Sequence, residues 1–533
     1  MDIDNNSVAN IGSGIYKNVS LVLGDLGSTR GLSIRYLSSF TKGKGIKTKI
    51  LFPIIGNRGF NSLPRLTEIQ KDMVLQFLNE HRATHFGCYL MTGHFRAFKE
   101  LVLYLRKAGW QGCIIAGGVH PTVCPEESLF EGVDYAVMGP GERPLIDIIS
   151  NESNEKISGL IYKKNGNIIK NEIMSDAFID LDLLPFPDYE HEDHFVISST
   201  TIQQMSESVF RKLSGWGGEY YYLTTTRGCP YGCSYCCNVN KHKLRRASVD
   251  RIIAELQYAK SKLPFLCGVN IQDDSFFMGS DEWVAEFCSK YGREFGWPFV
   301  ARIMPRFCSE ERLIMLKNAG LRYVSIGLQG SERMNSEIYN RKENNESFLK
   351  ACRLMEKVNI IFVVDVILDV VYETEEDLRE VARTLNRLSR PFKVLAYSMT
   401  PFPGTDFYNR VVKDGLLNDF AADAYESMFI ATRPNAYKTP LYWRRLIKNV
   451  IPLYKNKEID VLIESGADDK SSELVVNRIY RRAVLRMKLA EWLRQRFPRY
   501  FTRAVSLYTY FNRKLSGQQS PRSLRLNFRK NSK

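Results

Sequence analysis

The chain has 533 residues, of which 44% are hydrophobic and 12% aromatic, so two or three globular domains are expected and extensive disorder is excluded. Its formal net charge of +15 is uneven, because the segment from Ser471 onward holds 16 Lys or Arg against 2 Asp or Glu. No uninterrupted apolar run of about 18 residues occurs and the first residues are polar, which predicts a cytoplasmic protein without a membrane span or signal peptide.

Residues 15–150 alternate short apolar runs with amphipathic segments, which predicts five strands and four helices. The expected strands are residues 19–23, 49–52, 85–89, 113–116 and 135–138, and the expected helices are residues 31–40, 67–79, 95–108 and 142–149. This alternation is typical of an α/β fold with a parallel sheet covered on both faces, here in a flavodoxin-like order. Ligands are then expected at the carboxyl ends of the strands, where the loops are rich in glycine.

Residues 151–215 are predicted to form a hairpin followed by a linker. The hairpin spans residues 157–173 and turns at Asn165-Gly166, a dipeptide that favours a two-residue turn. Beyond it, Pro185 and Pro187 are incompatible with a helix interior and indicate a linker.

A second alternating series occupies residues 216–418. Its expected strands are residues 222–226, 268–272, 299–303, 323–327, 361–368 and 394–399, and its expected helices are residues 249–260, 283–295, 311–319, 346–357 and 375–388. Six strand–helix units predict a partial (β/α)6 barrel, in which active-site residues lie on the loops that follow the strands.

Residues 419–533 are predicted to be a helical, basic carboxy-terminal region with a disordered tail from Ser516. Residues 478–494 are basic and amphipathic, and residues 497–515 continue with aromatic residues and arginines. This segment could lie on the inner membrane surface, approach a lipid or phosphorylated substrate, contact RNA, or pack its apolar side on the barrel. We do not expect nucleic acid as a partner.

Three of the 11 cysteines form a compact motif directly after the first barrel strand. Cys229, Cys233 and Cys236 have the spacing C-x3-C-x2-C on a loop rich in glycine and proline. Zinc would require a further ligand, for which Cys237 and His242 are the nearby candidates. Three thiolates on a cubane iron–sulfur cluster would leave one iron free for a substrate or cofactor. A zinc knot and a chance grouping of core cysteines are the alternatives.

The segment Thr226-Arg227-Gly228-Cys229-Pro230-Tyr231-Gly232-Cys233-Ser234-Tyr235-Cys236 resembles the radical S-adenosylmethionine (SAM) superfamily. The resemblance implies that Cys229, Cys233 and Cys236 hold a 4Fe-4S cluster, whose unique iron binds the amino and carboxylate groups of SAM. Reductive cleavage of SAM then yields a 5'-deoxyadenosyl radical, and an external flavodoxin or ferredoxin would supply the electron.

Three further motifs resemble those of this superfamily. Gln272-Asp273-Asp274-Ser275-Phe276 resembles D-D-x-F, Gly327-Leu328-Gln329-Gly330-Ser331-Glu332 resembles G-[LI]-[EQ]-S-G, and Pro401-Phe402-Pro403-Gly404-Thr405 resembles P-x-P-G-T. By this resemblance Asp273, Asp274, Gln329 and Glu332 would hold SAM, although each acidic residue could instead be a solvated carboxylate or a helix cap. Residues 369–374 depart from the pattern, because they read Asp-Val-Val-Tyr-Glu-Thr in place of G-x-P-G-E-T.

The first domain resembles the cobalamin-binding domain that precedes many radical SAM barrels, through residues 117–122, 125–127, 134–135 and 139–142. The resemblance implies that cobalamin binds to Gly117, Gly118, His120, Gly139, Gly141 and Glu142. Residues 25–31 lack the family's D-x-H-x-x-G, so no imidazole there can ligate cobalt and the corrin would have no lower ligand from the protein. A domain that binds no corrin, and a structural role for His120 in its own turn, are the alternatives.

Together these resemblances imply a cobalamin-dependent, class B-like radical SAM methyltransferase that acts on an unactivated carbon or phosphorus of a small metabolite, natural product or lipid. One SAM would generate the radical and a second would remethylate cobalamin. The alternatives are a radical SAM oxidase, cyclase or rearrangement enzyme with a vestigial cobalamin domain, an RNA methylthiotransferase, and a non-enzymatic iron–sulfur protein that binds RNA or senses redox state. Against the methylthiotransferase, Cys88, Cys113 and Cys124 lack the compact spacing of a second cluster.

Overall fold

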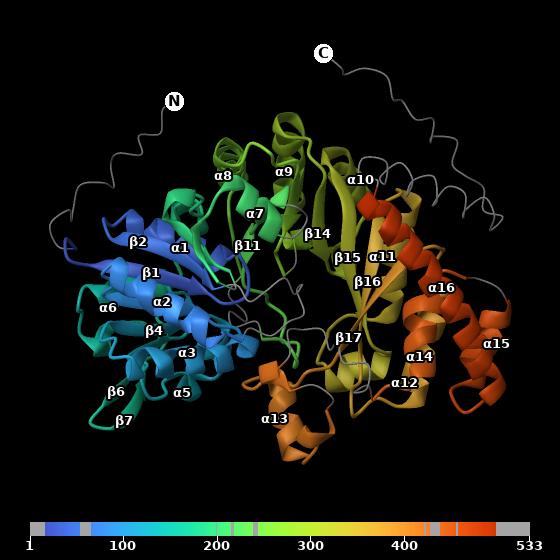
Figure 1. Cartoon of the computed structure of the whole chain (residues 1–533). Helices are drawn as coiled ribbons and strands as arrows, with labels where there is room; N and C mark the ends of the chain where they lie inside the picture. Colours follow the sequence, from blue (N-terminus) through green and yellow to red (C-terminus); the bar gives the residue numbers. More distant parts are fainter. Residues whose placement is uncertain are drawn as a thin grey trace.

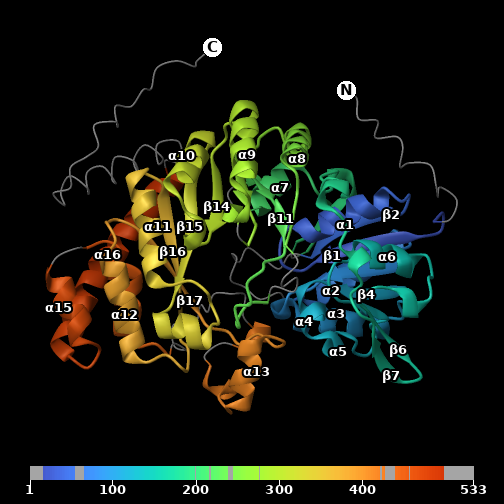
Figure 2. The same ribbon diagram turned by 180° about the vertical axis from the view of Figure 1, so that it is seen from behind.

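The computed structural model describes residues 16–53, 65–198, 200–214, 218–237, 244–274, 276–420, 423–426, 438–454 and 457–496. These residues form two α/β bodies that lie side by side, with carboxy-terminal helices packed on the far side of the second body (Figure 1). The same arrangement is visible from behind, where the strands of the two bodies belong to separate sheets (Figure 2).

The first body is built on a nine-stranded sheet. From one edge to the other its strands are β7 (Asn167–Lys170), β6 (Leu160–Lys164), β5 (Tyr135–Val137), β4 (Cys113–Gly117), β3 (His85–Tyr89), β1 (Ser20–Asp25), β2 (Lys47–Pro53), β8 (His194–Ile197) and β9 (Ile202–Gln204). The five central strands are parallel, in the flavodoxin-like order that the sequence predicts.

The sheet extends beyond those five strands on both sides. The hairpin β6–β7 pairs antiparallel to β5, and its turn residues Asn165 and Gly166 both have positive φ, as a two-residue turn of this kind requires. On the other side β8 and β9 come from the segment interpreted as a linker. The sequence does not reveal these strands because both are short, and β8 is placed by its pairing with β2 while β9 forms the edge of the sheet.

Alternate residues of β1 serve two hydrophobic cores. Leu21 and Leu23 belong to the core under α1 (Leu32–Lys42) and α6 (Glu142–Ile149), whereas Val22 belongs to the core under α2 (Glu68–Glu80) and α3 (Phe95–Lys107). The core under α1 and α6 continues into the second body, so the two bodies share buried apolar surface.

The second body is an open barrel of six parallel strands in chain order, as predicted. The strands are β10 (Tyr220–Leu223), β13 (Gly268–Ile271), β14 (Phe299–Ile303), β15 (Leu321–Gln329), β16 (Ile361–Leu368) and β17 (Lys393–Ser398). They alternate with α8 (Val249–Lys262), α9 (Asp281–Glu294), α10 (Glu310–Ala319), α11 (Asn345–Lys357) and α12 (Glu375–Asn386), and α13 (Asp406–Lys413) follows β17. Side chains of Ser, Asn or Thr cap the amino termini of these helices, which explains where each one begins.

The carboxy-terminal region adds α14 (Leu441–Arg445), α15 (Lys457–Ser465) and α16 (Lys470–Arg496). The side chain of Trp443 is fully buried, which anchors this region to the barrel. Residues 497–533, including the predicted disordered tail, lie outside the described residues. Among the described residues, no helix is both long and apolar enough to span a membrane.

Candidate active site

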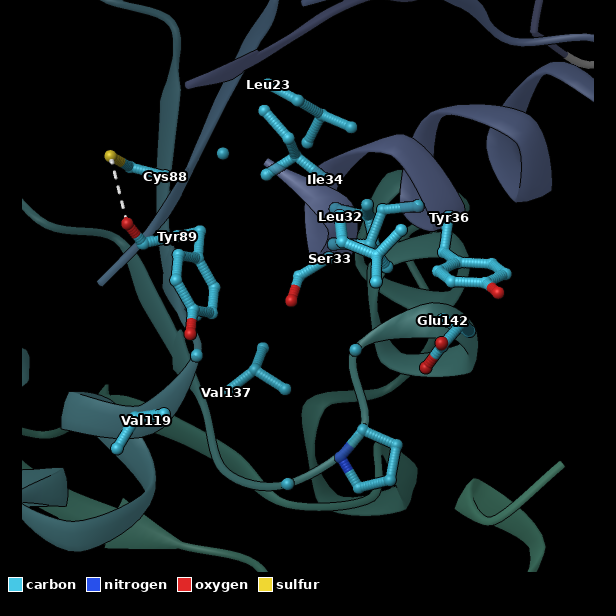
Figure 3. Close-up of a pocket in the computed structure, with 18 of the residues that line it drawn as sticks. Leu23, Leu32, Ser33, Ile34, Tyr36, Cys88, Tyr89, Val119, Val137 and Glu142 are labelled. Atoms are coloured by element: carbon cyan, nitrogen blue, oxygen red, sulfur yellow. Dashed lines mark hydrogen bonds between the residues drawn. The ribbon is translucent and has the colours of Figure 1, made fainter. Parts of the chain in front are cut away.

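A cavity of about 310 Å³ opens at the carboxyl ends of the strands in the first sheet (Figure 3). Apolar side chains such as Leu23, Ile34 and Val137 form much of its wall, and Gly117, Gly118, Gly139, Gly141 and Glu142 also line it. The structure therefore brings five of the six residues predicted to bind cobalamin to one cavity.

Gly117 and Gly118 differ in what a side chain at each position would meet. Gly118 has a φ of 106°, and a Cβ there would lie 2.7 Å from the Tyr89 ring and 2.9 Å from the Leu90 carbonyl oxygen. At Gly117 a Cβ would meet no atom within 4 Å. Gly118 is thus required by the chain itself, whereas Gly117 leaves space for a ligand.

His120 is the predicted cobalamin residue that the structure does not bring to the cavity. Its ring is fully buried, 4.4 Å from the ring of Phe95, and its Nδ1 atom lies 3.3 Å from Thr92 Oγ1. Burial lowers the pKa of His120 to about 4, so the ring is neutral at physiological pH. The alternative of a role in its own segment fits this placement better than a corrin contact.

The first strand loop, which lacks the cobalt-ligating histidine, is held by its own carboxylate. Asp25 Oδ1 accepts hydrogen bonds from the backbone N–H of Gly27 at 2.7 Å and of Ser28 at 3.3 Å. Burial raises the pKa of Asp25 to about 6 despite these bonds. The residues present therefore fit a corrin held by glycine backbone and apolar side chains, with no imidazole from this loop.

Three residues of the barrel domain, Thr224, Arg227 and Arg245, complete the wall of the cavity. Arg227 forms an ion pair with Glu142 at 2.5 Å, and Glu142 is almost fully buried. Burial alone would raise the pKa of Glu142, but the charge of Arg227 outweighs it and the pKa is lowered. Since Arg227 is two residues from Cys229, this ion pair joins the cavity to the cysteine loop.

A buried polar network supports the same interface. The Arg227 guanidinium lies 4.9 Å over the ring of Tyr36, and the Tyr36 hydroxyl donates to Glu255 at 3.0 Å. Glu255 also accepts a hydrogen bond from Tyr221 at 2.8 Å and pairs with Arg251 at 3.0 Å. Tyr36 belongs to the first body and Glu255 to the second, so their contact fixes how the domains face each other.

The three predicted cluster ligands lie half-buried on one loop after β11 (Thr226–Arg227). The loop is anchored at Ser234, whose backbone N–H donates to Tyr339 O at 2.8 Å and whose hydroxyl donates to Ile338 O at 2.7 Å. The backbone carbonyl of Ser234 accepts a hydrogen bond from Phe407 N at 2.9 Å. The loop is thus positioned by segments that follow β15 and β17.

The three sulfur atoms are not gathered as tightly as the ligand atoms of a single metal ion. Among the described residues, they do not form a set of ligand atoms within 4.8 Å of one another. Burial raises the pKa of the Cys229 thiol, with a further contribution from Asp274 and an opposing one from Arg341. The role of these cysteines as cluster ligands stays a prediction.

The two adjacent aspartates predicted to hold SAM have different surroundings. Asp273 is buried, and its carboxylate accepts hydrogen bonds from Thr225 N at 2.7 Å, from Thr226 N at 3.0 Å and from the Thr225 hydroxyl. Burial raises the pKa of Asp273 to about 6. Asp273 therefore positions the strand that leads into the cysteine loop, whereas Asp274 is exposed beside Cys229.

The other two predicted SAM residues also differ. Gln329 has a φ of 65° at a bulge between β15 and β16, a conformation that non-glycine residues rarely adopt and that is common at functional sites. Glu332 instead accepts a hydrogen bond from Asn345 N at 2.6 Å at the start of α11. The side chain that caps α11 is that of Asn344, and a role of Glu332 toward SAM stays a prediction.

The departure at residues 369–374 has a structural explanation. Asp369 adopts a φ of 62°, the left-handed conformation for which the family pattern uses glycine. Its buried carboxylate accepts from Thr439 N at 2.9 Å and pairs with Arg444 and Ser398. The aspartate therefore ties the barrel end to the carboxy-terminal region, a contact for which the sequence contains no spacing signal.

Sequence reasoning also missed a polar group on the inner face of the barrel. Asp365 on β16 accepts hydrogen bonds from the Ser325 hydroxyl at 2.5 Å and from the Tyr397 hydroxyl at 3.4 Å. Burial raises the pKa of Asp365, and Arg302 opposes this rise. Polar residues at alternate positions of neighbouring strands are the pattern that could have revealed this group.

Each of the two α/β bodies matches a known protein family. Residues 21–149 match the B12 binding domain and residues 223–385 match the radical SAM superfamily. The chain therefore contains a B12-binding domain followed by a radical SAM domain. A radical SAM domain works with a 4Fe-4S cluster and SAM, a B12-binding domain takes cobalamin, and such an enzyme needs an electron donor and a small-molecule substrate.

Curated relatives are distant. An uncharacterized methyltransferase of Pyrococcus horikoshii is 24% identical over 57% of this chain and 64% of its own length, so the chain spans slightly less than two thirds of it. The bacteriochlorophyllide d C-8(2)-methyltransferase of Chlorobaculum tepidum is 21% identical over 68% of this chain and 75% of its own. The anaerobic magnesium-protoporphyrin IX monomethyl ester cyclase of Rubrivivax gelatinosus is 21% identical over 80% of this chain and 73% of its own.

Two solved structures share the fold of this chain. The radical SAM methyltransferase TsrM of Kitasatospora setae, with tryptophan and a SAM analogue bound, has a TM-score of 0.59 at 15% identity and covers 74% of this chain and 76% of its own. The cobalamin-dependent radical SAM enzyme OxsB, with aqua-cobalamin and SAM bound, has a TM-score of 0.60 at 16% identity. The match covers 80% of this chain and 65% of the OxsB chain.

Proposed function

We propose that this enzyme is a cobalamin-dependent radical SAM methyltransferase that acts on an unactivated carbon or phosphorus of a small molecule. The observation that carries the proposal is the shared cavity, whose walls come from the B12-binding domain and from Thr224, Arg227 and Arg245 beside the cysteine loop. A methyl carrier and a radical source that serve one substrate must face a common space, and this arrangement supports that requirement.

When bound, the cluster and SAM supply the 5'-deoxyadenosyl radical and cobalamin supplies the methyl group. The residues of this chain have separate tasks. Cys229, Cys233 and Cys236 would hold the cluster as thiolates, and the exposed carboxylate of Asp274 can accept from the amino group of SAM. The ion pair of Glu142 with Arg227 keeps the corrin cavity aligned with the cysteine loop.

The inner face of the barrel is the proposed substrate site. Asp365, Ser325 and Tyr397 form a polar group there, and Arg302 opposes the effect of burial on the Asp365 carboxylate. Such side chains favour a substrate with hydrogen-bonding or ionic groups of both signs over a purely apolar one. Because its pKa is raised, the Asp365 carboxyl keeps its proton to a higher pH than an aspartate exposed to solvent does.

The deciding experiment reconstitutes the full chain anaerobically with iron, sulfide and hydroxocobalamin, removes unbound corrin, and assays the reduced enzyme with SAM. We expect retained corrin in the absorption spectrum together with both 5'-deoxyadenosine and S-adenosylhomocysteine. Formation of 5'-deoxyadenosine alone by a protein that retains no corrin would reject the methyltransferase and leave a radical SAM enzyme of another reaction type.

That other type would be a cyclase or oxidase. The observation that favours it is the extent of the match to the anaerobic cyclase of Rubrivivax gelatinosus, which covers 80% of this chain against 68% for the Chlorobaculum methyltransferase. A cyclase would consume SAM with 5'-deoxyadenosine as the product and would form no S-adenosylhomocysteine, so the same assay separates the two.

We further propose that helix α16 contacts the inner, anionic membrane surface. Leu474 and Leu485 are 72% and 71% exposed, and Arg478 lies between them on the same face, a pattern typical of helices at an interface. Replacing Leu474 and Leu485 by Glu should reduce cosedimentation with phosphatidylserine vesicles. The same change at Val461, which is 62% exposed on α15, is the matched control and should have no effect. Equal binding by all variants would reject this contact.

A further inference from the structure

A second group of metal-binding side chains lies outside the cysteine loop, on the two short helices that follow β4. His120, Cys124 and Glu127 each offer one ligand atom, and these three atoms lie within 4.8 Å of one another. The residues come from α4 (Val119–Val123), α5 (Pro125–Ser128) and the cysteine that joins them. Spacings of four and three residues place successive side chains on one face of a helical segment.

The His120 ring is arranged as a metal-binding imidazole would be. The side chain is 0% exposed, yet its Nε2 atom has no hydrogen-bond partner among the described residues. Its Nδ1 lies 3.3 Å from Thr92 Oγ1, so Thr92 can hold the ring proton on Nδ1 and leave the Nε2 lone pair free. A buried polar atom without a partner is costly, and a metal ion on Nε2 would remove that cost.

The distance between His120 and Glu127 distinguishes coordination from a hydrogen bond. Nε2 and Glu127 Oε2 are 3.6 Å apart, which is too long for a hydrogen bond. Two ligand atoms on a tetrahedral zinc ion are separated by about 3.3 Å when the bonds are roughly 2.0 Å long. A neutral imidazole, a thiolate and a carboxylate would also balance the charge of a divalent ion at this partly buried place.

Outer contacts hold the ligands and connect the two domains. Tyr425, from the segment after the barrel, donates to Glu127 Oε2 at 2.5 Å, and its ring lies 6.0 Å from that of His120. Arg96 and Asp423 form an ion pair at 2.8 Å beside it. Hydrogen bonds to a ligating carboxylate are typical of the surroundings of a metal site.

We propose that His120, Cys124 and Glu127 bind one zinc ion, with a water molecule as the fourth ligand, and that this ion fixes the α4–α5 segment of the B12-binding domain against residues 423–426. Binding releases one proton, from the Cys124 thiol, as the zinc–sulfur bond forms. The site is separate from the cysteine loop and does not depend on the proposed methyltransferase reaction.

The test measures zinc in the isolated full chain by plasma mass spectrometry, with iron measured in parallel. We expect about one zinc per chain in the wild type and in Cys113→Ala, a matched control that removes another half-buried cysteine of the same domain. The same amount should remain when Cys229, Cys233 and Cys236 are all replaced by Ala, because the ion does not occupy the cluster site. Cys124→Ala should lose at least nine tenths of the zinc.

Glu127→Gln provides a second variant, since Glu127 is 40% exposed and its replacement should not prevent folding. Chelator competition should give at least a tenfold lower zinc affinity for it, and zinc-edge absorption of the wild type should show one sulfur among lighter ligands. Zinc absent from the wild type even after dialysis against zinc, retained in full by Cys124→Ala, or lost with the three cluster cysteines would overturn the proposal.

Discussion

The cavity of the B12-binding domain and the cysteine loop are joined by the ion pair of Glu142 with Arg227, but they differ in their chemistry. The cavity is bounded by glycine backbone and apolar side chains, and its buried carboxylate, Glu142, is already paired with Arg227. The cysteine loop offers three thiols and is held at Ser234 by hydrogen bonds from other segments. We therefore expect ligand binding in the cavity to be weakened by substitutions that add atoms to its wall. Cluster binding at the cysteine loop should instead be weakened by substitutions that remove a thiol.

The largest expected effect comes from removing one thiol. Cys233→Ala should abolish SAM cleavage, because a cubane that has lost one of three protein thiolates is no longer held at the site. Corrin binding should be unchanged, since the cavity contains no cysteine of this loop. The measurements are 5'-deoxyadenosine formation and corrin retention on the same reconstituted protein.

Cys237→Ala is the matched control, because Cys237 is the neighbouring half-buried cysteine outside the C-x3-C-x2-C spacing. It should retain cleavage. Cleavage retained by Cys233→Ala, or corrin lost together with cleavage, would show that the two sites are not separable in this way.

The complementary effect comes from adding atoms to the cavity. Gly118→Val should lower corrin affinity about tenfold or more, because its side chain collides with Tyr89, which itself lines the cavity. Relief of the strain, on the order of 1–3 kcal/mol, would displace this part of the cavity wall. SAM cleavage should persist. Corrin titration followed by absorbance measures the first effect and 5'-deoxyadenosine the second.

Gly117→Ala sharpens this comparison, since a Cβ at Gly117 meets no atom of the protein. The variant should fold with unchanged stability, so any loss of corrin affinity would report a ligand in that space. Wild-type affinity in both variants would place the corrin elsewhere.

The same contrast explains what could be predicted from the sequence. Features that follow from residue type and spacing can be predicted: the strand–helix alternation predicts both sheets, and the cysteine motif predicts the superfamily. Roles that depend on the direction of a side chain cannot. Asp273 and Asp274 are adjacent in the chain, yet one holds backbone N–H groups and the other lies exposed beside Cys229.

Contacts between residues far apart in the sequence cannot be predicted for a related reason. Asp369 breaks the family's glycine pattern, and nothing local indicates that its carboxylate pairs with Arg444 of the carboxy-terminal region. The resemblance of residues 117–122 to cobalamin-binding domains predicts that His120 binds cobalamin, but the ring lies against Phe95 and outside the cavity lining. In both cases the backbone position was predictable and the side-chain direction was decided by packing.

The smallest effect concerns the ion pair that joins the two sites. Glu142→Gln should lower the free energy of unfolding by about 1–2 kcal/mol, less than for a fully buried pair because Arg227 keeps some contact with water. The lowered pKa of Glu142 means that its contribution is complete above the ordinary value of 4.5 and is lost as the pH falls below it. The difference in urea stability between wild type and variant should therefore be largest above pH 4.5 and shrink as the pH is lowered below it. Glu126→Gln, which removes an exposed ion pair with Lys170, is the control and should leave stability unchanged. If the stability difference between wild type and Glu142→Gln did not depend on pH, the lost stability would come from packing. The ion pair would then not be an electrostatic link between the cavity and the cysteine loop.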